Sequence, residues 1–197
     1  MQNKAQPSEA RLGTVIGRIA LVLGLVFGSA TLAQAQTQTP PPPAAQVVDA
    51  GVMKARAEGK TVLIEFGASW CTWCRNFEAF VASADAGRVL AAHFVVVKLT
   101  VLERGEKQSL EHSGGRTLME RWGGASSGLP FYVFLDSTGQ KVADSNAMAD
   151  GTNIGYPAVP AEIDAFVRVM GRAAPSMSAE DRAVLSAYLT REAKVTR

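Results

Sequence analysis

Residues 66–75 read Phe66-Gly67-Ala68-Ser69-Trp70-Cys71-Thr72-Trp73-Cys74-Arg75, and they hold both cysteines of this 197-residue chain. The residues before them, 61–66, are β-branched and apolar, which is typical of a buried strand. After them, apolar residues recur at helical spacing over 77–81. A C-x-x-C pair between a strand and a helix places its first sulfur at the helix N-terminus, where free N–H groups and the helix dipole favour a thiolate. We therefore expect the pKa of Cys71 to lie below that of an ordinary thiol.

Dithiol–disulfide exchange is the chemistry that this context favours, and three other interpretations of the pair are weaker. A structural zinc site usually has four ligands, so His93 and His112 would have to complete it, and their spacing does not match H-x₃₋₅-H. A haem attachment site needs a histidine directly after the second cysteine, where this chain has Arg75. An inert disulfide over so short a loop would stabilise little. We expect no metal and no cofactor.

The first 35 residues have the pattern of a signal peptide. Three basic side chains precede an apolar core at residues 19–27, and Leu32-Ala33-Gln34-Ala35 supplies the small-x-small pattern of a cleavage site, which we place after Ala35. The uncharged run over 19–33 is shorter than the roughly 18 residues of a spanning helix. An uncleaved membrane anchor is the alternative. In both cases the protein is expected outside the cytoplasm, periplasmic or secreted. In such an oxidising compartment other proteins carry disulfides with which it can exchange.

The remaining chain is electrically balanced. Without residues 1–35, basic and acidic side chains are equal in number, so the whole-chain net charge of +2 reflects the N-terminal segment and gives no sign of nucleic-acid binding. Residues 36–46 are polar and then proline-rich, as in an extended linker. Residues 47–197 have the size of one domain, without internal repeats or a dimerisation segment, and we expect a monomer.

Within residues 47–197 the apolar pattern alternates between helices and strands. We expect helices over 47–58, 75–81, 85–92, 161–170 and 178–192, and strands over 61–66, 94–101, 131–135 and 140–145. The first two strands are joined through a helix, so they should be parallel. The charged segment 102–115 is expected as a surface loop, and so is the segment 146–160, for which the alternative is that Gly155-Tyr156-Pro157 folds over the Cys71–Cys74 site. The pattern predicts an α/β fold with a central sheet flanked by helices.

Four features, in order along the chain, resemble one family. They are Trp70-Cys71-x-x-Cys74 between a strand and a helix, Glu65 six residues before the first cysteine, Lys98-Leu99 in the next parallel strand, and Gly128-Leu129-Pro130 at the opening of a hairpin. The chain thereby resembles thioredoxin-fold proteins, and more narrowly exported thioredoxin-like proteins similar to the C-terminal domain of the disulfide reductase DsbD. This implies a mixed central sheet, to which the chain adds a C-terminal helix. Thr72-Trp73 in place of Gly-Pro departs from thioredoxin.

The resemblance implies catalytic roles for four residues. Cys71 would attack a substrate disulfide, and Cys74 would then resolve the mixed disulfide. Glu65, buried beneath the helix start, would accept the proton of Cys74, and its pKa would be raised by burial and lowered by Lys98. The alternative is that Glu65 and Lys98 form an ion pair without a kinetic role.

The resemblance also implies a binding site for the substrate. The family has a cis proline at the position of Pro130, and the residue before it, here Leu129, offers its backbone groups to an extended peptide. Trp70 and Trp73 flank the first sulfur and are candidate substrate contacts. The alternatives are core filling for Leu129 and an exposed turn position for Trp73.

Together these expectations describe an extracytoplasmic thiol-disulfide oxidoreductase that acts as a reductase of protein disulfides. Such a reductase needs electrons from a membrane thiol carrier of the DsbD kind. An oxidase that donates its disulfide is the alternative within the same chemistry. A metallochaperone could bind Cu(I) through the two thiolates, but no methionine- or histidine-rich motif accompanies Cys71. A redox-inactive binding module is disfavoured because both cysteines are present.

Overall fold

The computed structural model describes residues 39–195, so the expected signal peptide at residues 1–35 lies outside the described part. The helices are α1 (Ala44–Glu58), α2 (Thr72–Ala82), α3 (Ala84–His93), α4 (Gly115–Met119), α5 (Pro160–Ala173) and α6 (Ala179–Val195), and the strands are β1 (Thr61–Gly67), β2 (Phe94–Thr100), β3 (Phe131–Leu135) and β4 (Lys141–Asp144). A 3-10 helix, η1 (Gly105–Leu110), and a π-helical turn, η2 (Glu120–Gly124), lie between β2 and β3. No helix in the described range is both long and apolar enough to cross a membrane.

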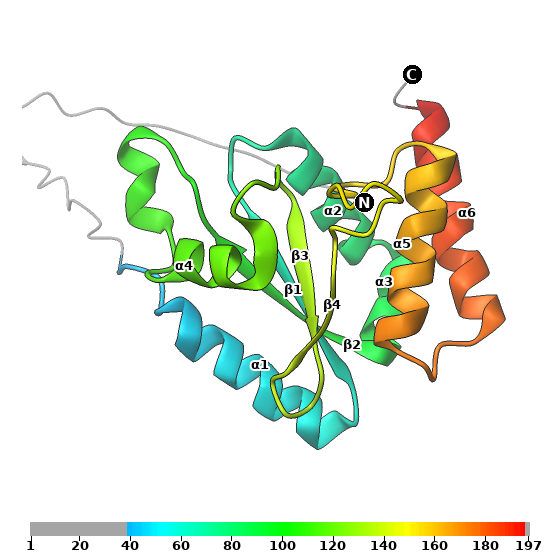
Figure 1. Cartoon of the computed structure of the whole chain (residues 1–197), viewed down its shortest axis with the longest axis horizontal. Coiled ribbons are helices and arrows are strands. Elements are labelled where there is room, and N and C mark those ends of the chain that lie inside the picture. Colours follow the sequence, from blue (N-terminus) through cyan, green and yellow to red (C-terminus); the bar gives the residue numbers. More distant parts are fainter. Residues whose placement is uncertain (1–38, 196–197) are drawn as a thin grey trace, which may run out of the picture. The chain divides into compact units, whose positions relative to one another are not determined.

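The four strands form one mixed sheet in the order β2-β1-β3-β4 (Figure 1). β1 and β2 are parallel, with Thr61 opposite Phe94, and β3 is antiparallel to both β1 and β4. The chain passes from β1 to β2 through α2 and α3, which is the connection that the sequence predicts. Six of the seven residues of β1 are buried, in keeping with its nearly continuous apolar sequence. The mixed sheet flanked by helices confirms the predicted fold.

Helices cover both faces of the sheet, and each face has its own core (Figure 1). On one face, Ile64 and Phe66 of β1 pack with residues of α1. On the other face, Leu63 joins a core that includes Phe77 and Phe80 of α2 together with residues of α3, α5 and α6. Successive residues of β1 belong to different cores because strand side chains alternate between the two faces. The two buried phenylalanines anchor α2, and thereby hold its first residues just beyond the end of β1.

The predicted C-terminal helix is present as α6. It packs against α3 and α5, and its Leu185 and Leu189 are fully buried. Its start is capped, because the Asp181 N–H donates a hydrogen bond to Ser178 Oγ at 3.0 Å. The Asp181 carboxylate also lies 3.0 Å from His93 Nε2, which ties α6 to α3.

The start of α1 differs from the expectation. The helix begins at Ala44, so residues 44–46 are helical and do not belong to the proline-rich linker that was placed at 36–46. Pro43 is extended directly before the helix, and Ala44 is fully buried with its N–H bonded to Ser113 O at 2.9 Å. A contact with a residue distant in sequence therefore sets this boundary. The predicted end is correct, because Gly59 takes the left-handed conformation that closes the helix.

Candidate active site at Cys71 and Cys74

Cys71 and Cys74 form a disulfide at the start of α2, with their Cα atoms 5.3 Å apart. Cys71 is the N-cap residue, and its sulfur accepts a hydrogen bond from the Cys74 N–H at 3.1 Å. Cys71 is 5% exposed and Cys74 is 0% exposed. The placement of the first sulfur at a helix start, where its N–H groups lack partners within the helix, is as expected. Of the two sulfurs, only that of Cys71 belongs to a residue with any contact to solvent.

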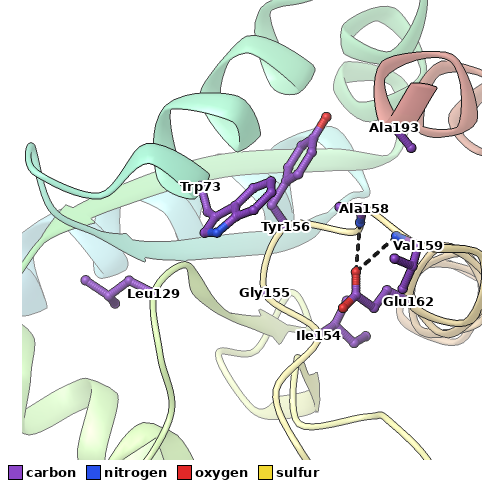
Figure 2. A pocket seen from close by; sticks show the side chains of 9 residues that line it. All are labelled: Trp73, Leu129, Ile154, Gly155, Tyr156, Ala158, Val159, Glu162 and Ala193. Carbon is purple, nitrogen blue, oxygen red and sulfur yellow. Dashed lines mark hydrogen bonds between the residues drawn. The ribbon is translucent and has the colours of Figure 1, made fainter. Parts of the chain in front are cut away.

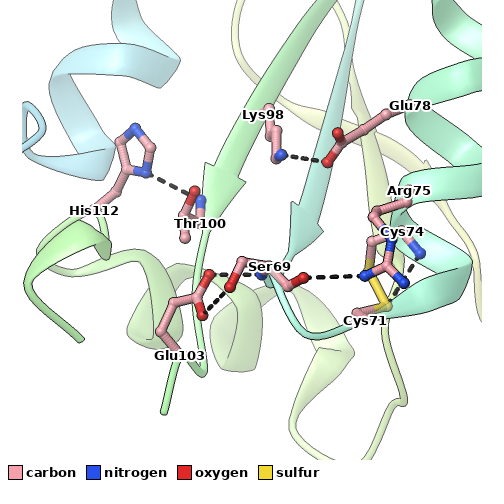
Figure 3. A network of polar contacts seen from close by, with 9 residues as sticks. All are labelled: Ser69, Cys71, Cys74, Arg75, Glu78, Lys98, Thr100, Glu103 and His112. Carbon is pink, nitrogen blue, oxygen red and sulfur yellow. Dashed lines mark hydrogen bonds and ion pairs between the residues drawn. A yellow bond between two sulfur atoms is a disulfide. The ribbon is translucent and has the colours of Figure 1, made fainter. Parts of the chain in front are cut away.

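A buried carboxylate holds the loop that precedes Cys71 (Figure 3). Glu103, 5% exposed, accepts hydrogen bonds from the N–H of Ser69 at 2.6 Å and from Ser69 Oγ at 2.9 Å. On the far side of the same residue, Arg75 Nη1 donates to Ser69 O at 3.1 Å. Segment 102–115, expected as a surface loop, thus carries a buried acid as well as η1. Glu103 was not anticipated from the sequence.

One signal could have found Glu103. The carboxyl ends of parallel strands meet at the same edge of a sheet. β1 is followed by the loop to Cys71, and β2 is followed by residues 101–103. The N–H of Val101 donates to Gly67 O at 2.9 Å, which brings the two segments together directly after their strands.

The two tryptophans beside Cys71 are similarly exposed but differ in their contacts. Trp70 is 42% exposed, donates from Nε1 to Leu102 O at 2.7 Å, and lies beneath the guanidinium of Arg104, whose Cζ is 4.1 Å from the ring centroid. Trp73 is 43% exposed and stacks on Tyr156, with centroids 5.9 Å apart and planes 18° apart. Trp73 is therefore a partly exposed residue with a fixed aromatic partner on one side.

Glu65 lies beneath the disulfide in a dry environment. It is 2% exposed, and its Oε1 has no hydrogen-bond partner among the described residues. Burial raises the pKa of Glu65 to about 7; the positive charge of Lys98 opposes this rise and the negative charge of Glu78 adds to it. The sequence-based expectation of a buried acid with a raised pKa agrees with this environment.

The alternative of a Glu65–Lys98 ion pair does not agree with the structure. Glu65 and Lys98 are cross-strand neighbours in the parallel register, but the Lys98 ammonium pairs with Glu78 on α2 (Figure 3). β2 is an edge strand, so the Lys98 side chain can remain in contact with water while it pairs with Glu78. If the Lys98 ammonium moved against the buried Glu65, it would lose its contact with water, which costs free energy. Lys98 therefore affects Glu65 only through the electrostatic effect of its positive charge, which lowers the pKa of Glu65.

Gly67 marks the point where Glu65 and Cys74 approach each other. A Cβ at position 67 would lie 3.1 Å from Glu65 Oε1 and 3.4 Å from Cys74 Sγ. The carboxyl oxygen and the buried sulfur thus both lie close to the same point beside Gly67. Glu65 is therefore the carboxyl group that borders Cys74 at this point.

The Leu129–Pro130 peptide bond is cis, as the resemblance implied. Leu129 packs against the small cluster of Ala68, Cys71 and Cys74. Asn153 clamps the loop around it, because its Nδ2 donates to Gly128 O at 2.8 Å and to Pro130 O at 3.1 Å. Within the described part of the chain, no hydrogen bond occupies the N–H or C=O of Leu129.

Segment 146–160 reaches the active site and is not merely a packed surface loop. Its Tyr156 is 7% exposed and stacks on Trp73, and Asn153 holds the Pro130 loop. The pattern of polar and apolar residues over this segment has no periodicity from which such a position follows. Only the contact between distant residues reveals it.

The two histidines lie away from the cysteines. His93 contacts Ser176 and Asp181, and His112 Nδ1 accepts a hydrogen bond from the Thr100 N–H at 3.0 Å. Burial lowers the pKa of His112. In the described residues, no group of three or more His, Cys, Asp or Glu is arranged to hold a metal ion.

Comparison with known proteins agrees with this geometry. Residues 44–137 match a family model described as Thioredoxin-like. The chain is 30% identical over 95 residues to the thiol:disulfide interchange protein DsbD of Photorhabdus laumondii subsp. laumondii, and 28% identical over 100 residues to that of Yersinia pestis. These alignments cover 47% and 51% of this chain, but only 15% of each relative.

A solved structure is also similar. The disulphide isomerase from Xylella fastidiosa Temecula1 aligns with 89% of this chain and 100% of its own, at 20% identity and a TM-score of 0.43. Residues 44–137 thus match the Thioredoxin-like family model and are similar in sequence to part of the thiol:disulfide interchange proteins DsbD, and they hold the Cys71–Cys74 pair at the start of α2.

Proposed function

We propose that the protein is an extracytoplasmic thiol-disulfide oxidoreductase that exchanges its Cys71–Cys74 dithiol or disulfide with other proteins. The observation that carries this proposal is the disulfide at the start of α2, beside the cis Pro130 loop and next to a buried carboxyl group. Each of these three features suits one requirement of exchange: a reactive sulfur, a place for the substrate chain and an acceptor for a proton.

In the reducing direction, Cys71 attacks first because its sulfur lies at the helix start. The N–H groups of the first turn, including that of Cys74, stabilise a thiolate at this position. Arg75 adds a positive charge, since its guanidinium donates to Ser69 O and Thr72 Oγ1 on either side of Cys71 in the sequence. The thiolate bonds to one sulfur of the substrate disulfide, and the other sulfur leaves as a thiolate and takes up a proton.

Cys74 then resolves the mixed disulfide. Its thiol must lose a proton at a fully buried position, and the Glu65 carboxylate is the acceptor beside it. A pKa of about 7 allows Glu65 to take up a proton and release it again near neutral pH. The Cys74 thiolate attacks the sulfur of Cys71, the Cys71–Cys74 disulfide forms, and the second substrate sulfur leaves as a thiolate.

The substrate chain binds beside Leu129. The N–H and C=O of this residue carry no hydrogen bond within the described structure, and its side chain packs next to the disulfide. An extended peptide can pair with these groups as an added strand, which gives affinity without strict sequence requirements. Trp70 and Trp73, both partly exposed, flank the same place and supply apolar contact.

We assign the protein to reduction of protein disulfides, and each cycle then requires two electrons from a thiol donor. Outside the cytoplasm that donor is a membrane thiol carrier, in keeping with the interchange proteins to which the domain is similar. The signal-like pattern of residues 1–35 supports export. All the groups named above come from one chain, so the reaction needs no second subunit.

Reduction of insulin disulfides by the purified protein, with dithiothreitol as the electron source, tests the activity. Cys71→Ser should abolish it, and a wild-type protein no faster than dithiothreitol alone would overturn the proposal. The equilibrium with glutathione then gives the direction. A potential near −270 mV agrees with a reductase, and one near −120 mV would make the protein an oxidase.

A further inference from the structure

A pocket of about 380 Å³ opens next to the disulfide site, between α2 and segment 146–160 (Figure 2). Leu129, which also packs against the cysteine cluster, is one of its lining residues. In Figure 2, Leu129 lies at one end and Glu162 at the other, with the stacked rings of Trp73 and Tyr156 between them. The pocket therefore begins at the residue that receives the substrate chain and leads away from it.

The walls of the pocket are apolar and fixed. Trp73 and Tyr156 stack on each other, and Tyr156 is 7% exposed. Ile154 is 3% exposed, and its N–H donates to Ser145 O at 2.8 Å beside the edge strand. Such walls suit the methylene chain of a long side chain, which gains by leaving water.

The far end of the pocket is acidic. Glu162 accepts hydrogen bonds from the N–H groups of Ala158 at 2.8 Å and Val159 at 3.2 Å, and both reach the same oxygen, Oε2. Its Oε1 has no partner among the described residues, and Glu162 is the one charged residue among those described that line the pocket. This end of the pocket therefore carries the negative charge of Glu162.

We propose that this pocket binds the side chain of a lysine or arginine that flanks the reacting cysteine of the substrate protein. The inference rests on the proposed function and names a preference of the same site. The aliphatic stem lies along Trp73 and Tyr156, and the cationic group reaches Glu162 Oε1. The preference for a basic side chain comes from segment 146–160, which supplies Tyr156, and from α5, which supplies Glu162.

Other side chains fit this pocket less well. An apolar side chain of the same length would cover a carboxylate oxygen without giving it a hydrogen bond, which is costly. An acidic side chain would be repelled by Glu162, and charge repulsion is a common source of discrimination. A short polar side chain would not extend from Leu129 to Glu162, which lie at opposite ends in Figure 2.

The test compares disulfide-linked peptides that differ only at the positions flanking the cysteine. These positions carry lysine, norleucine or glutamate, and kcat/KM for reduction by the full protein is measured for each peptide. We expect the lysine peptide to react about fivefold faster than the norleucine peptide, with glutamate slowest, because a partly exposed ion pair contributes modestly. The advantage of lysine should fall as the salt concentration rises.

Glu162→Gln removes the charge and keeps an oxygen that can accept from Ala158 and Val159. This variant should reduce the lysine-to-norleucine ratio to about one. Asp164→Asn is the matched control, because it removes an exposed charge from the same helix outside this pocket, and it should leave the ratio unchanged. Thermal unfolding of both variants shows whether α5 remains intact.

The outcomes separate this inference from the proposed function. If wild-type protein reduces all three peptides with equal kcat/KM, or prefers norleucine at every salt concentration, the inference is overturned and the oxidoreductase function stands. If the lysine preference survives Glu162→Gln in a folded variant, the pocket is not its source and the inference is again overturned. If no peptide and no insulin is reduced, the proposed function itself fails.

Discussion

The replacement Glu65→Gln should stabilise the oxidised protein, and the gain should depend on pH. Burial raises the pKa of Glu65 from 4.5 to about 7, against the opposing charge of Lys98. The folded state therefore holds this proton more tightly than the unfolded state, so stability falls as the pH rises from 4.5 through 7. At about 1.36 kcal/mol for each pKa unit, ionisation of Glu65 costs about 3 kcal/mol above pH 7 and nothing well below pH 4.5.

The assay is urea unfolding of the oxidised protein at pH 5, 7 and 8, followed by tryptophan fluorescence. The disulfide removes both cysteine thiols from the titration, which leaves Glu65 as the buried acid whose ionisation changes in this window. Between pH 5 and 8 the wild type should lose about 2–3 kcal/mol that Glu65→Gln retains. Glu106→Gln, which removes an exposed charge from η1, is the control and should follow the wild type.

One outcome of the urea experiment would refute the raised pKa of Glu65. Two stability curves that stay parallel, within about 0.5 kcal/mol over the whole range, would mean that Glu65 ionises in the folded protein as it does in the unfolded chain. The argument from desolvation would then be wrong. The assignment of Glu65 as a proton acceptor near neutral pH would lose its basis as well.

Three further predictions concern the same site. Cys74→Ser should accumulate a mixed disulfide on Cys71, visible as an added substrate mass under non-reducing conditions, whereas Cys71→Ser should form none. Gly67→Ala should slow release of the substrate by about tenfold in rapid-mixing experiments, with less effect on the first attack, because the added methyl group would lie between Glu65 and Cys74. Glu103→Ala should lower the free energy of unfolding by about 2–3 kcal/mol in urea titrations, since it removes the two hydrogen bonds that Ser69 donates to the buried Glu103.

Each of these predictions has an outcome that contradicts it. Rapid turnover by Cys74→Ser would remove the need for a resolving thiol. Equal slowing of both steps by Gly67→Ala would point to a general distortion of the loop instead of a blocked proton path. If Glu103→Ala were as stable as the wild type, the loop before Cys71 would be held by other contacts.

Local features of the sequence were sufficient for the framework and for the position of the reactive pair. The β-branched runs at 61–66 and 94–101 correspond to β1 and β2. The change from a strand pattern to a helix pattern over residues 66–75 correctly placed Cys71 at the start of α2. These features follow from neighbours in the chain. A strand that is buried on both faces needs a continuous apolar run, and an amphipathic helix needs apolar residues on one side.

Contacts between distant residues could not be predicted in this way. Lys98 lies opposite Glu65 in the parallel register and its charge lowers the pKa of Glu65, but its ammonium pairs with Glu78, because an ammonium on an edge strand keeps its water while it reaches α2. Glu103 carried no signal in the pattern of polar and apolar residues, and for Tyr156 a position over the active site was only the less favoured alternative. Their importance comes from burial and from their partners, Ser69 and Trp73.

The sequence by itself therefore determined that a C-x-x-C pair lies between a strand and a helix, in an α/β domain with a mixed sheet. The tertiary structure alone decided which groups surround the pair: the dry site of Glu65, the clamp on the Pro130 loop and the pocket that ends at Glu162. The physical reason is that backbone hydrogen bonding and periodicity act over a few residues. Desolvation and side-chain pairing depend on whichever segments the completed fold brings together.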